Sequence, residues 1–376
     1  MTGHSNTPQT AGDDMRTRRL NPVWFLLAPA IGVLIFGLVE TVYHDGTPTI
    51  LYLISVPLLF ISVFVAVHHA EVVAHRIGQP FGSFLLALSV TLIEVSLIVS
   101  MLVADPAEDN SVARDTVFAA IMIVLNGIMG LCLLIGGMRF HVQEFQPRSA
   151  AAALGVLATL SVLGLVLPNF TQAVAGPIYA PGQLIFVAIV SLLLYALFLF
   201  VQMYSHKRDF LDAHDTGHAD KPRATGRALV LSVVALPLAL VSVVLQAEML
   251  ANPVRDGIRA ADLPEALVGV VIALIVLMPE GVAAIRAAMD NKLQTSLNLA
   301  LGSALASLCM TIPVVALLSV ALGRSLVLGL TAEHLVLLVL TLFISTLSLG
   351  LGRTTVLQGG IHLVIFGAFV TMSAIP

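Results

Sequence analysis

Apolar runs long enough to cross a lipid bilayer recur along most of this chain. The hydrocarbon core is about 30 Å thick, and a helix rising about 1.5 Å per residue needs about 20 apolar residues to cross it. Of the 376 residues, 58% are hydrophobic and 11% are charged, unlike soluble domains. Backbone groups in lipid must be satisfied within their own segment, which favours helices. The sequence therefore predicts an all-α polytopic membrane protein.

Charged and Pro/Gly-rich breaks separate these runs and define eleven predicted transmembrane helices. They lie at residues 23–42, 50–69, 83–104, 115–137, 150–168, 182–204, 227–247, 265–285, 294–321, 332–351 and 357–375.

Lys and Arg residues are distributed unequally between the two predicted sides of the membrane. With a cytoplasmic N-terminus, the inside loops hold 14 of the 18 Lys and Arg residues, and the outside loops hold only Arg114, Arg255, Arg259 and Arg324. Cytoplasmic loops usually carry the excess of positive charge. The count therefore predicts a cytoplasmic N-terminus and an external C-terminus.

The spans divide into one extra helix and two blocks of five. Residues 1–20 are predicted to be a disordered cytoplasmic tail, 21–45 to hold the extra first helix, and 205–226 to be a cytoplasmic linker between residues 46–204 and 227–376. Because five is odd, the blocks enter the membrane from opposite sides, which predicts two inverted five-helix repeats. Asp and His residues of the linker could bind a divalent cation, but a solvated hinge is the commoner interpretation.

Each block carries a glutamate in the middle of its second span. Glu94 lies in an apolar run without Lys or Arg between Ser83 and Asp105, and Glu280 lies in Leu-Met-Pro-Glu-Gly-Val. An isolated carboxylate at the bilayer centre costs about 2.5 to 3.5 kcal/mol on insertion scales. Some interaction must offset that cost in each half.

An inverted repeat would bring Glu94 and Glu280 together at the middle of the bilayer. Two carboxylates in one dry cavity do not easily remain ionised without a cation, and a hard cation such as Ca²⁺ prefers oxygen ligands. Pro279 and Gly281 flank Glu280, so we expect a helix break that frees a backbone carbonyl. Protons would bind the same carboxylates when the metal leaves, which is the basis of antiport. The alternative is a pair of protonated structural carboxylates.

Small polar residues near the glutamates are candidates for lining the same cavity. These candidates are Thr91, Ser96, Asn126, Pro279, Asn298, Gly302, Ser303 and Ser307. Small and hydroxyl-bearing residues serve equally well for close helix packing in membranes. Both interpretations therefore stay open.

A polar cluster at the cytoplasmic end of the second span contains His68, His69, Glu71 and His75. Histidine titrates near neutrality, so this cluster could relay protons or sense pH. A juxtamembrane cluster without such a role is the commoner case. His362, alone in the last span, is interpreted as a packing histidine rather than a ligand.

Three stretches carry a family resemblance: His-His-Ala-Glu-Val-Val from His68 through the Glu94 segment, Arg-Asp-Thr-Val-Phe from Arg114, and Leu-Met-Pro-Glu-Gly from Leu277. The chain resembles the ChaA-type bacterial calcium/proton antiporters of the cation/calcium exchanger superfamily. The resemblance implies ten core helices in two inverted repeats, with Glu94 and Glu280 binding both ions and protons. It also implies a secondary transporter of the bacterial inner membrane that exports Ca²⁺, and in some members Na⁺ or K⁺, against protons by alternating access.

The resemblance leaves the preferred cation open. Plant and fungal vacuolar exchangers carry Gly-Asn-x-x-Glu, whereas this chain has Ser-Val-Thr-Leu-Ile-Glu ending at Glu94. A monovalent Na⁺/H⁺ or K⁺/H⁺ antiporter that uses the same site is therefore the main alternative.

Other function classes fit the sequence less well. An intramembrane enzyme could use the glutamate pair as acid and base, but the chain contains no HExxH, GxSxG or Walker pattern. A channel would usually build carboxylate rings at a pore mouth from several subunits. We therefore expect no enzymatic activity, no cofactor and no nucleic-acid partner; the expected partners are inorganic cations, protons and the lipid bilayer.

Overall fold

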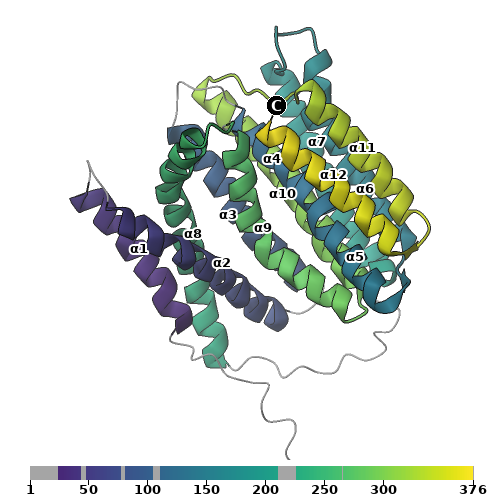
Figure 1. The fold of residues 1–376 in the computed structure, drawn as a ribbon, viewed down its shortest axis with the longest axis horizontal. Helices are drawn as coiled ribbons and strands as arrows, with labels where there is room; N and C mark the ends of the chain where they lie inside the picture. Colours follow the sequence, from purple (N-terminus) through teal and green to yellow (C-terminus); the bar gives the residue numbers. More distant parts are fainter. Residues whose placement is uncertain are drawn as a thin grey trace, which may run out of the picture.

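Helices account for nearly all of the computed structural model, which describes residues 24–43, 48–77, 81–104, 111–210, 226–264 and 266–375. The predicted tail at 1–20 and most of the predicted linker lie outside the described residues. The elements, labelled as in Figure 1, are α1 (Trp24–Val42), α2 (Thr49–Ile77), α3 (Phe81–Ala104), α4 (Val112–Met122), η1 (Ile123–Ile128), α5 (Met129–Phe140), β1 (Gln143–Glu144), α6 (Pro147–Ser161), η2 (Val162–Val166), η3 (Leu167–Phe170), α7 (Pro181–Phe200), η4 (Val201–Ser205), η5 (Lys207–Phe210), α8 (Gly226–Ala260), α9 (Ala266–Met289), α10 (Leu293–Leu322), α11 (Ala332–Leu349), β2 (Arg353–Thr354) and α12 (Val356–Ala374).

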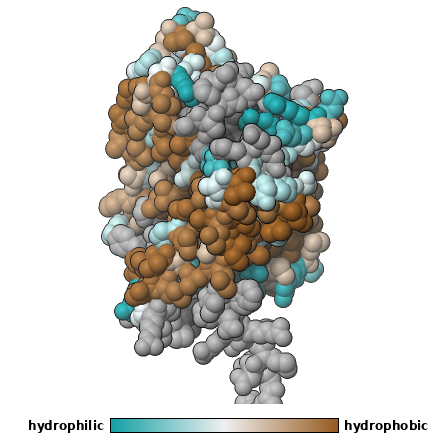
Figure 2. Space-filling model, turned by 90° about the vertical axis from the view of Figure 1, so that its left-hand side faces the viewer, coloured by the Kyte–Doolittle hydropathy of each residue, from teal (hydrophilic) through white to brown (hydrophobic). Residues whose placement is uncertain are grey.

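Nine helices of the described part are long and apolar enough to cross a membrane. The apolar stretches Leu26–Val42 of α1 and Leu88–Val99 of α3 are shorter than these nine. Apolar side chains cover much of the face shown in Figure 2, and Leu34 and Val230 are 71% and 65% exposed. Such a surface suits contact with lipid rather than water. The prediction of a helical membrane protein is confirmed, while the count of eleven spans stays a prediction.

Two helices extend well beyond the predicted spans. α2 ends at Ile77 rather than at 69, and α8 ends at Ala260 rather than at 247. A span predicted from apolar residues ends where the hydropathy falls. The helix itself can continue into water, because its backbone hydrogen bonds are made within the helix.

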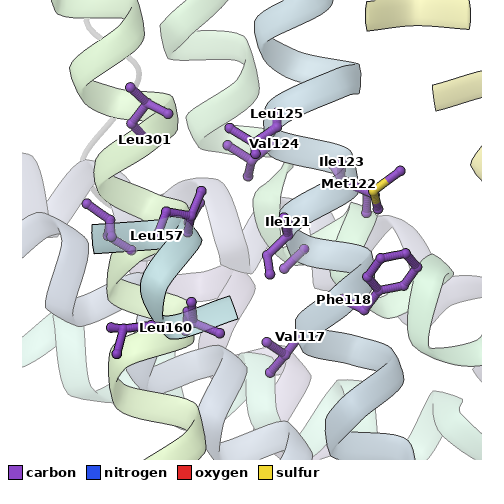
Figure 3. Close-up of a cluster of buried hydrophobic side chains, with 14 of the residues drawn as sticks. Val117, Phe118, Ile121, Met122, Ile123, Val124, Leu125, Leu157, Leu160 and Leu301 are labelled. Carbon is purple, nitrogen blue, oxygen red and sulfur yellow. The ribbon is translucent and has the colours of Figure 1, made fainter. Parts of the chain in front are cut away.

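The helices pack into two bodies, each around its own hydrophobic cluster. One cluster joins α2, α3 and α8 with Val276 of α9, and the larger one joins α4 to α7 and α9 to α12 with Ile98 of α3. In Figure 1 the helices α3 and α9 lie between α1, α2 and α8 on one side and the remaining helices on the other. Figure 3 shows part of the larger cluster, where Val117 and Ile121 of α4 lie on the side facing Leu157 and Leu160 of α6, and Phe118 points to the opposite side. The glutamate-bearing helices therefore lie at the boundary between the two bodies.

Glycines allow α5 and α12 to approach each other closely. A methyl group at Gly359 would clash with the backbone nitrogen of Leu134 and lie 2.8 Å from the carbonyl oxygen of Gly130. Small residues that bring helix backbones together are typical of membrane helix packing. This contact fixes α12 against the α4–η1–α5 segment.

We predict opposite effects of alanine at two adjacent glycines of α12. Gly359→Ala should destabilise the protein because the added methyl meets backbone atoms, whereas a methyl at Gly360 meets nothing within 4 Å. Alanine exceeds glycine in helix propensity by about 1 kcal/mol, so Gly360→Ala should leave the melting temperature in detergent equal or higher. Equal melting temperatures for the two variants would contradict the close approach of α5 and α12.

Candidate cation-binding site

The structure brings the two intramembrane glutamates into one buried site. Glu94 lies on α3 and is 2% exposed, and Glu280 lies on α9 and is 8% exposed. α3 and α9 pack against each other and both pack against α10, so the two carboxylates lie in one region of the interior. They come from the two halves of the chain, 186 residues apart in sequence (280 minus 94).

Two serines of α10 hold the two carboxylates. Ser307 donates a hydrogen bond to Oε2 of Glu94, and Ser303, one turn earlier on α10, lies beside Glu280. Residues four apart lie on the same face of a helix, so both serines point the same way. Helix α10, which packs against both α3 and α9, is therefore the shared support of the pair.

Each carboxylate also has an oxygen that is not hydrogen-bonded. Among the described residues, Oε1 of Glu94 and Oε2 of Glu280 are buried and have no hydrogen-bond partner. A buried polar atom without a partner costs free energy unless something else binds it. The two free oxygens are suited to a proton or a hard cation.

No basic residue is placed to neutralise the pair from the helices that build it. The sequences of α3 and α10 contain no Lys or Arg, and that of α9 contains one, Arg286, whose side chain is exposed. A buried salt bridge with these helices is thus excluded. A proton or a bound cation would neutralise the pair without a basic side chain from these three helices.

Space is open beside Gly302 of α10, and further hydroxyl-bearing side chains lie on α3. A methyl group at Gly302, next to Ser303, would meet no atom of the described residues within 4 Å. Thr91, one turn before Glu94 on α3, is 2% exposed, and Ser96 is half-buried. These residues place further oxygen-bearing side chains on the helix that carries Glu94.

The helix break predicted at Pro279 is wrong. α9 is helical from Ala266 to Met289, and Pro279 is buried inside it. The irregular backbone lies instead in η1, a π-helical turn at Ile123–Ile128 between α4 and α5. Gly281 packs against this turn, because a Cβ at Gly281 would lie 3.2 Å from the side chain of Ile128.

Two of the predicted lining residues are bonded elsewhere. Nδ2 of Asn126 donates to Oγ1 of Thr341 at 2.9 Å, and its Oδ1 lies 3.0 Å from Nδ1 of His362. Nδ2 of Asn298 donates to the carbonyl of Phe210 at 2.6 Å. Both asparagine side chains thus bond to groups outside the glutamate site.

The histidine cluster lies in the C-terminal turns of α2, where His69 contacts α8. Nδ1 of His69 is 3.0 Å from Oγ of Ser232 on α8, while His68 and Glu71 are exposed. The side chain of His75 lies outside the described part of the chain. The structure therefore assigns His69 a helix-packing contact and leaves the relay role a prediction.

Sequence reasoning missed the polar partners that lie far away in the chain. Thr341 and Ser348 of α11 bond to Asn126 and His362, and Gln246 of α8 bonds to Ser62 of α2 at 3.1 Å. The interpretation of His362 as a satisfied packing residue is confirmed, because both ring nitrogens have partners. A polar residue in an apolar run signals that a partner exists but does not identify it.

We predict that Glu280→Gln raises the thermal stability of the purified protein in metal-free detergent. Glutamine keeps nearly the same volume and removes a buried charge with an unpartnered oxygen, and functional sites often sacrifice stability. The expected rise in melting temperature is about 2 to 4 °C. Glu144→Gln, at a side chain 69% exposed, should leave the melting temperature unchanged. A lower melting temperature for Glu280→Gln would mean that a structural bond to the carboxylate had been lost.

Comparison with known proteins identifies the family. The family model described as sodium/calcium exchanger protein matches residues 47–204 and 229–375. The putative ionic transporter y4hA of Sinorhizobium fredii is 48% identical over 355 residues, which cover 94% of this chain and 97% of the relative. The sodium-potassium/proton antiporter ChaA of Escherichia coli is 35% identical over 315 residues, covering 82% of this chain and 84% of that protein.

A solved structure shares the fold. The crystal structure of the Ca²⁺/H⁺ antiporter protein YfkE has a TM-score of 0.70 at 18% sequence identity, covering 94% of this chain and 100% of that one. Its helices therefore have the same overall arrangement as those described above. The chain belongs to the sodium/calcium exchanger protein family.

Proposed function

We propose that the protein is a secondary active transporter that exchanges cytoplasmic Ca²⁺, with Na⁺ and K⁺ as competing cations, for external protons. The observation that carries this proposal is the buried pair Glu94 and Glu280 beside Ser307 and Ser303 of α10, with Ser307 hydrogen-bonded to Glu94 and no basic residue on α3 or α10. The pair provides two negative charges and free oxygen atoms in an apolar interior. Hard cations and protons are the species that such a donor set binds.

The need to neutralise the two carboxylates couples the movement of the cation to the movement of protons. An ionised and empty pair would be too costly to carry through an apolar interior. A bound divalent cation removes that cost, and so do protons on the carboxylates. The site therefore becomes accessible from the other side of the membrane only when it is occupied. A cation bound from one side and protons bound from the other then exchange across the membrane.

The two packing bodies support an alternating-access motion. The cluster of α2, α3 and α8 is separate from the larger cluster, and α3 and α9 contribute side chains to both. Sliding of one body against the other would change the side from which water reaches Glu94 and Glu280, as in transporters whose repeats rock around a fixed site.

We also propose the finer topology that the loops predicted: eleven spans, two inverted repeats at 46–204 and 227–376, and a cytoplasmic N-terminus in the bacterial inner membrane. Support comes from the two matched family segments and from the packing of α2 against α8, which are the first helices of their respective halves. The charge bias of the loops supports the orientation.

A monovalent antiporter is the second candidate. The relative ChaA of Escherichia coli, 35% identical, is named a sodium-potassium/proton antiporter. The same two carboxylates could bind Na⁺ or K⁺ with fewer ligands in a larger or softer cavity. Competition among the three cations in one assay decides between the candidates.

We predict that Glu94→Gln and Glu280→Gln each abolish proton-coupled cation flux. Each replacement removes one negative charge and one proton-binding group at nearly constant volume. A pH-sensitive dye in everted membrane vesicles or in proteoliposomes reports the flux while Ca²⁺, Na⁺ and K⁺ are titrated. We expect Ca²⁺ to collapse the imposed pH gradient at the lowest concentration.

Glu144→Gln serves as the matched control, because it lies outside the site and loses only an exposed ion pair with Arg353, its own side chain being 69% exposed. It should transport as the wild type does. Normal exchange by either site variant in correctly inserted protein would refute the proposed role of the pair. A response to Na⁺ and K⁺ but none to Ca²⁺ would replace the proposal by the monovalent candidate.

A further inference from the structure

A second buried polar network surrounds the π-helical turn η1, apart from the two glutamates. It joins Asn126 of η1, Thr341 and Ser348 of α11 and His362 of α12, each at most 3% exposed. Asn126 contacts Thr341 at 2.9 Å and His362 at 3.0 Å, and Nε2 of His362 lies 3.2 Å from Oγ of Ser348. Three helical segments thus meet through side-chain hydrogen bonds in an apolar interior.

The donors and acceptors of this network fit a neutral imidazole. Oδ1 of Asn126 can only accept, so Nδ1 of His362 carries the proton and Nε2 accepts from the Ser348 hydroxyl. Nδ2 of Asn126 donates to Thr341, whose hydroxyl lies 3.4 Å from the sulfur of Met122. Each of these polar atoms has a partner, so the network defines one arrangement of the three segments.

The network fixes an unusual piece of backbone. Asn126 lies within the π-helical turn Ile123–Ile128, and such turns are rare and occur frequently at functional sites. α12 approaches the turn closely, because a methyl at Gly130 would lie 3.0 Å from Cβ of His362. His362 therefore packs directly on the segment that it hydrogen-bonds.

The other face of the same turn touches the glutamate site. Ile128 ends η1, and its side chain would lie 3.2 Å from a Cβ at Gly281, the neighbour of Glu280. α9 packs against η1 along this contact. A shift of the turn would therefore move the backbone that carries the Glu280 carboxylate.

We propose that His362 is a positioning residue for transport: through Asn126 it holds the π-helical turn, and through Ile128 against Gly281 the turn sets the place of Glu280. This inference rests on the proposed function of the glutamate pair. It assigns His362 no contact with the ion and no proton of its own to transport. Its removal should weaken cation binding more than it slows turnover.

The test measures exchange by the full chain in proteoliposomes, with Ca²⁺ as the probe, and separates the half-saturating concentration from the maximal rate. His362→Leu removes both hydrogen bonds and should raise the half-saturating concentration about three- to tenfold, a typical effect of coupling through packed side chains. The maximal rate should stay within about twofold of wild type. His362→Asn keeps a donor toward Asn126 without a titratable ring and should restore most of the affinity.

Leu157→Ala is the control for general destabilisation, because Leu157 is fully buried on α6 and outside the network. It should lower the melting temperature but leave the half-saturating concentration unchanged. An equal change in Leu157→Ala and His362→Leu would overturn the proposal, as would an unchanged concentration in His362→Leu. If His362→Asn behaves like His362→Leu, the ring itself is required and the positioning role is also wrong.

If His362→Leu does not fold, Thr341→Val provides the test. Thr341→Val removes one hydroxyl of the network at nearly equal volume, and an unchanged half-saturating concentration in this variant would overturn the proposal. The two proposals fail separately. Wild-type behaviour of His362→Leu beside an inactive Glu280→Gln contradicts only the positioning role, whereas a wild-type protein without exchange contradicts the transport function itself.

Discussion

Two carboxylates buried in one apolar region, on helices that both pack against α10, are the constraint on which the rest of this structure depends. Glu94 and Glu280 keep free oxygen atoms, and α3 and α10 offer no basic side chain to neutralise them. Their electrostatic cost is acceptable only while a cation or protons occupy the site. A buried pair of carboxylates is a poor structural element. It suits a carrier, because the protein can change conformation only when a cation or protons occupy the site.

Helix α10 packs against both α3 and α9 and so joins Glu94 and Glu280 in one site. Its serines Ser303 and Ser307 contact both glutamates, although the helix belongs to the second half alone. The small-residue segment around Asn126 is instead hydrogen-bonded to Thr341 and His362. The two segments therefore differ in what they contribute: α10 places hydroxyl groups beside the carboxylates, and residues 123–128 form a π-helical turn that packs beside Glu280. This division also places the site at the boundary between the two hydrophobic clusters.

The sequence predicted the features that depend on local composition. Apolar runs located the helices, and a charge inside such a run singled out Glu94 and Glu280, because few other arrangements tolerate a carboxylate there. It could not predict which distant groups pair, so it leaves Asn126 between cavity lining and helix packing and does not identify Thr341 as its partner. Proline suggested a break at Pro279, yet α9 stays helical there, because packing holds the turns on either side. The π-helical turn has no comparable signal in residue types.

Proton release on cation binding tests the central claim most directly. Purified protein in weakly buffered detergent solution is titrated with Ca²⁺ while a pH indicator records the protons released per ion bound. If cation and protons compete for the two carboxylates, wild-type protein releases protons as it binds, and Glu94→Gln or Glu280→Gln releases fewer or none. Tight binding of Ca²⁺ by the wild type without any release of protons would contradict the account.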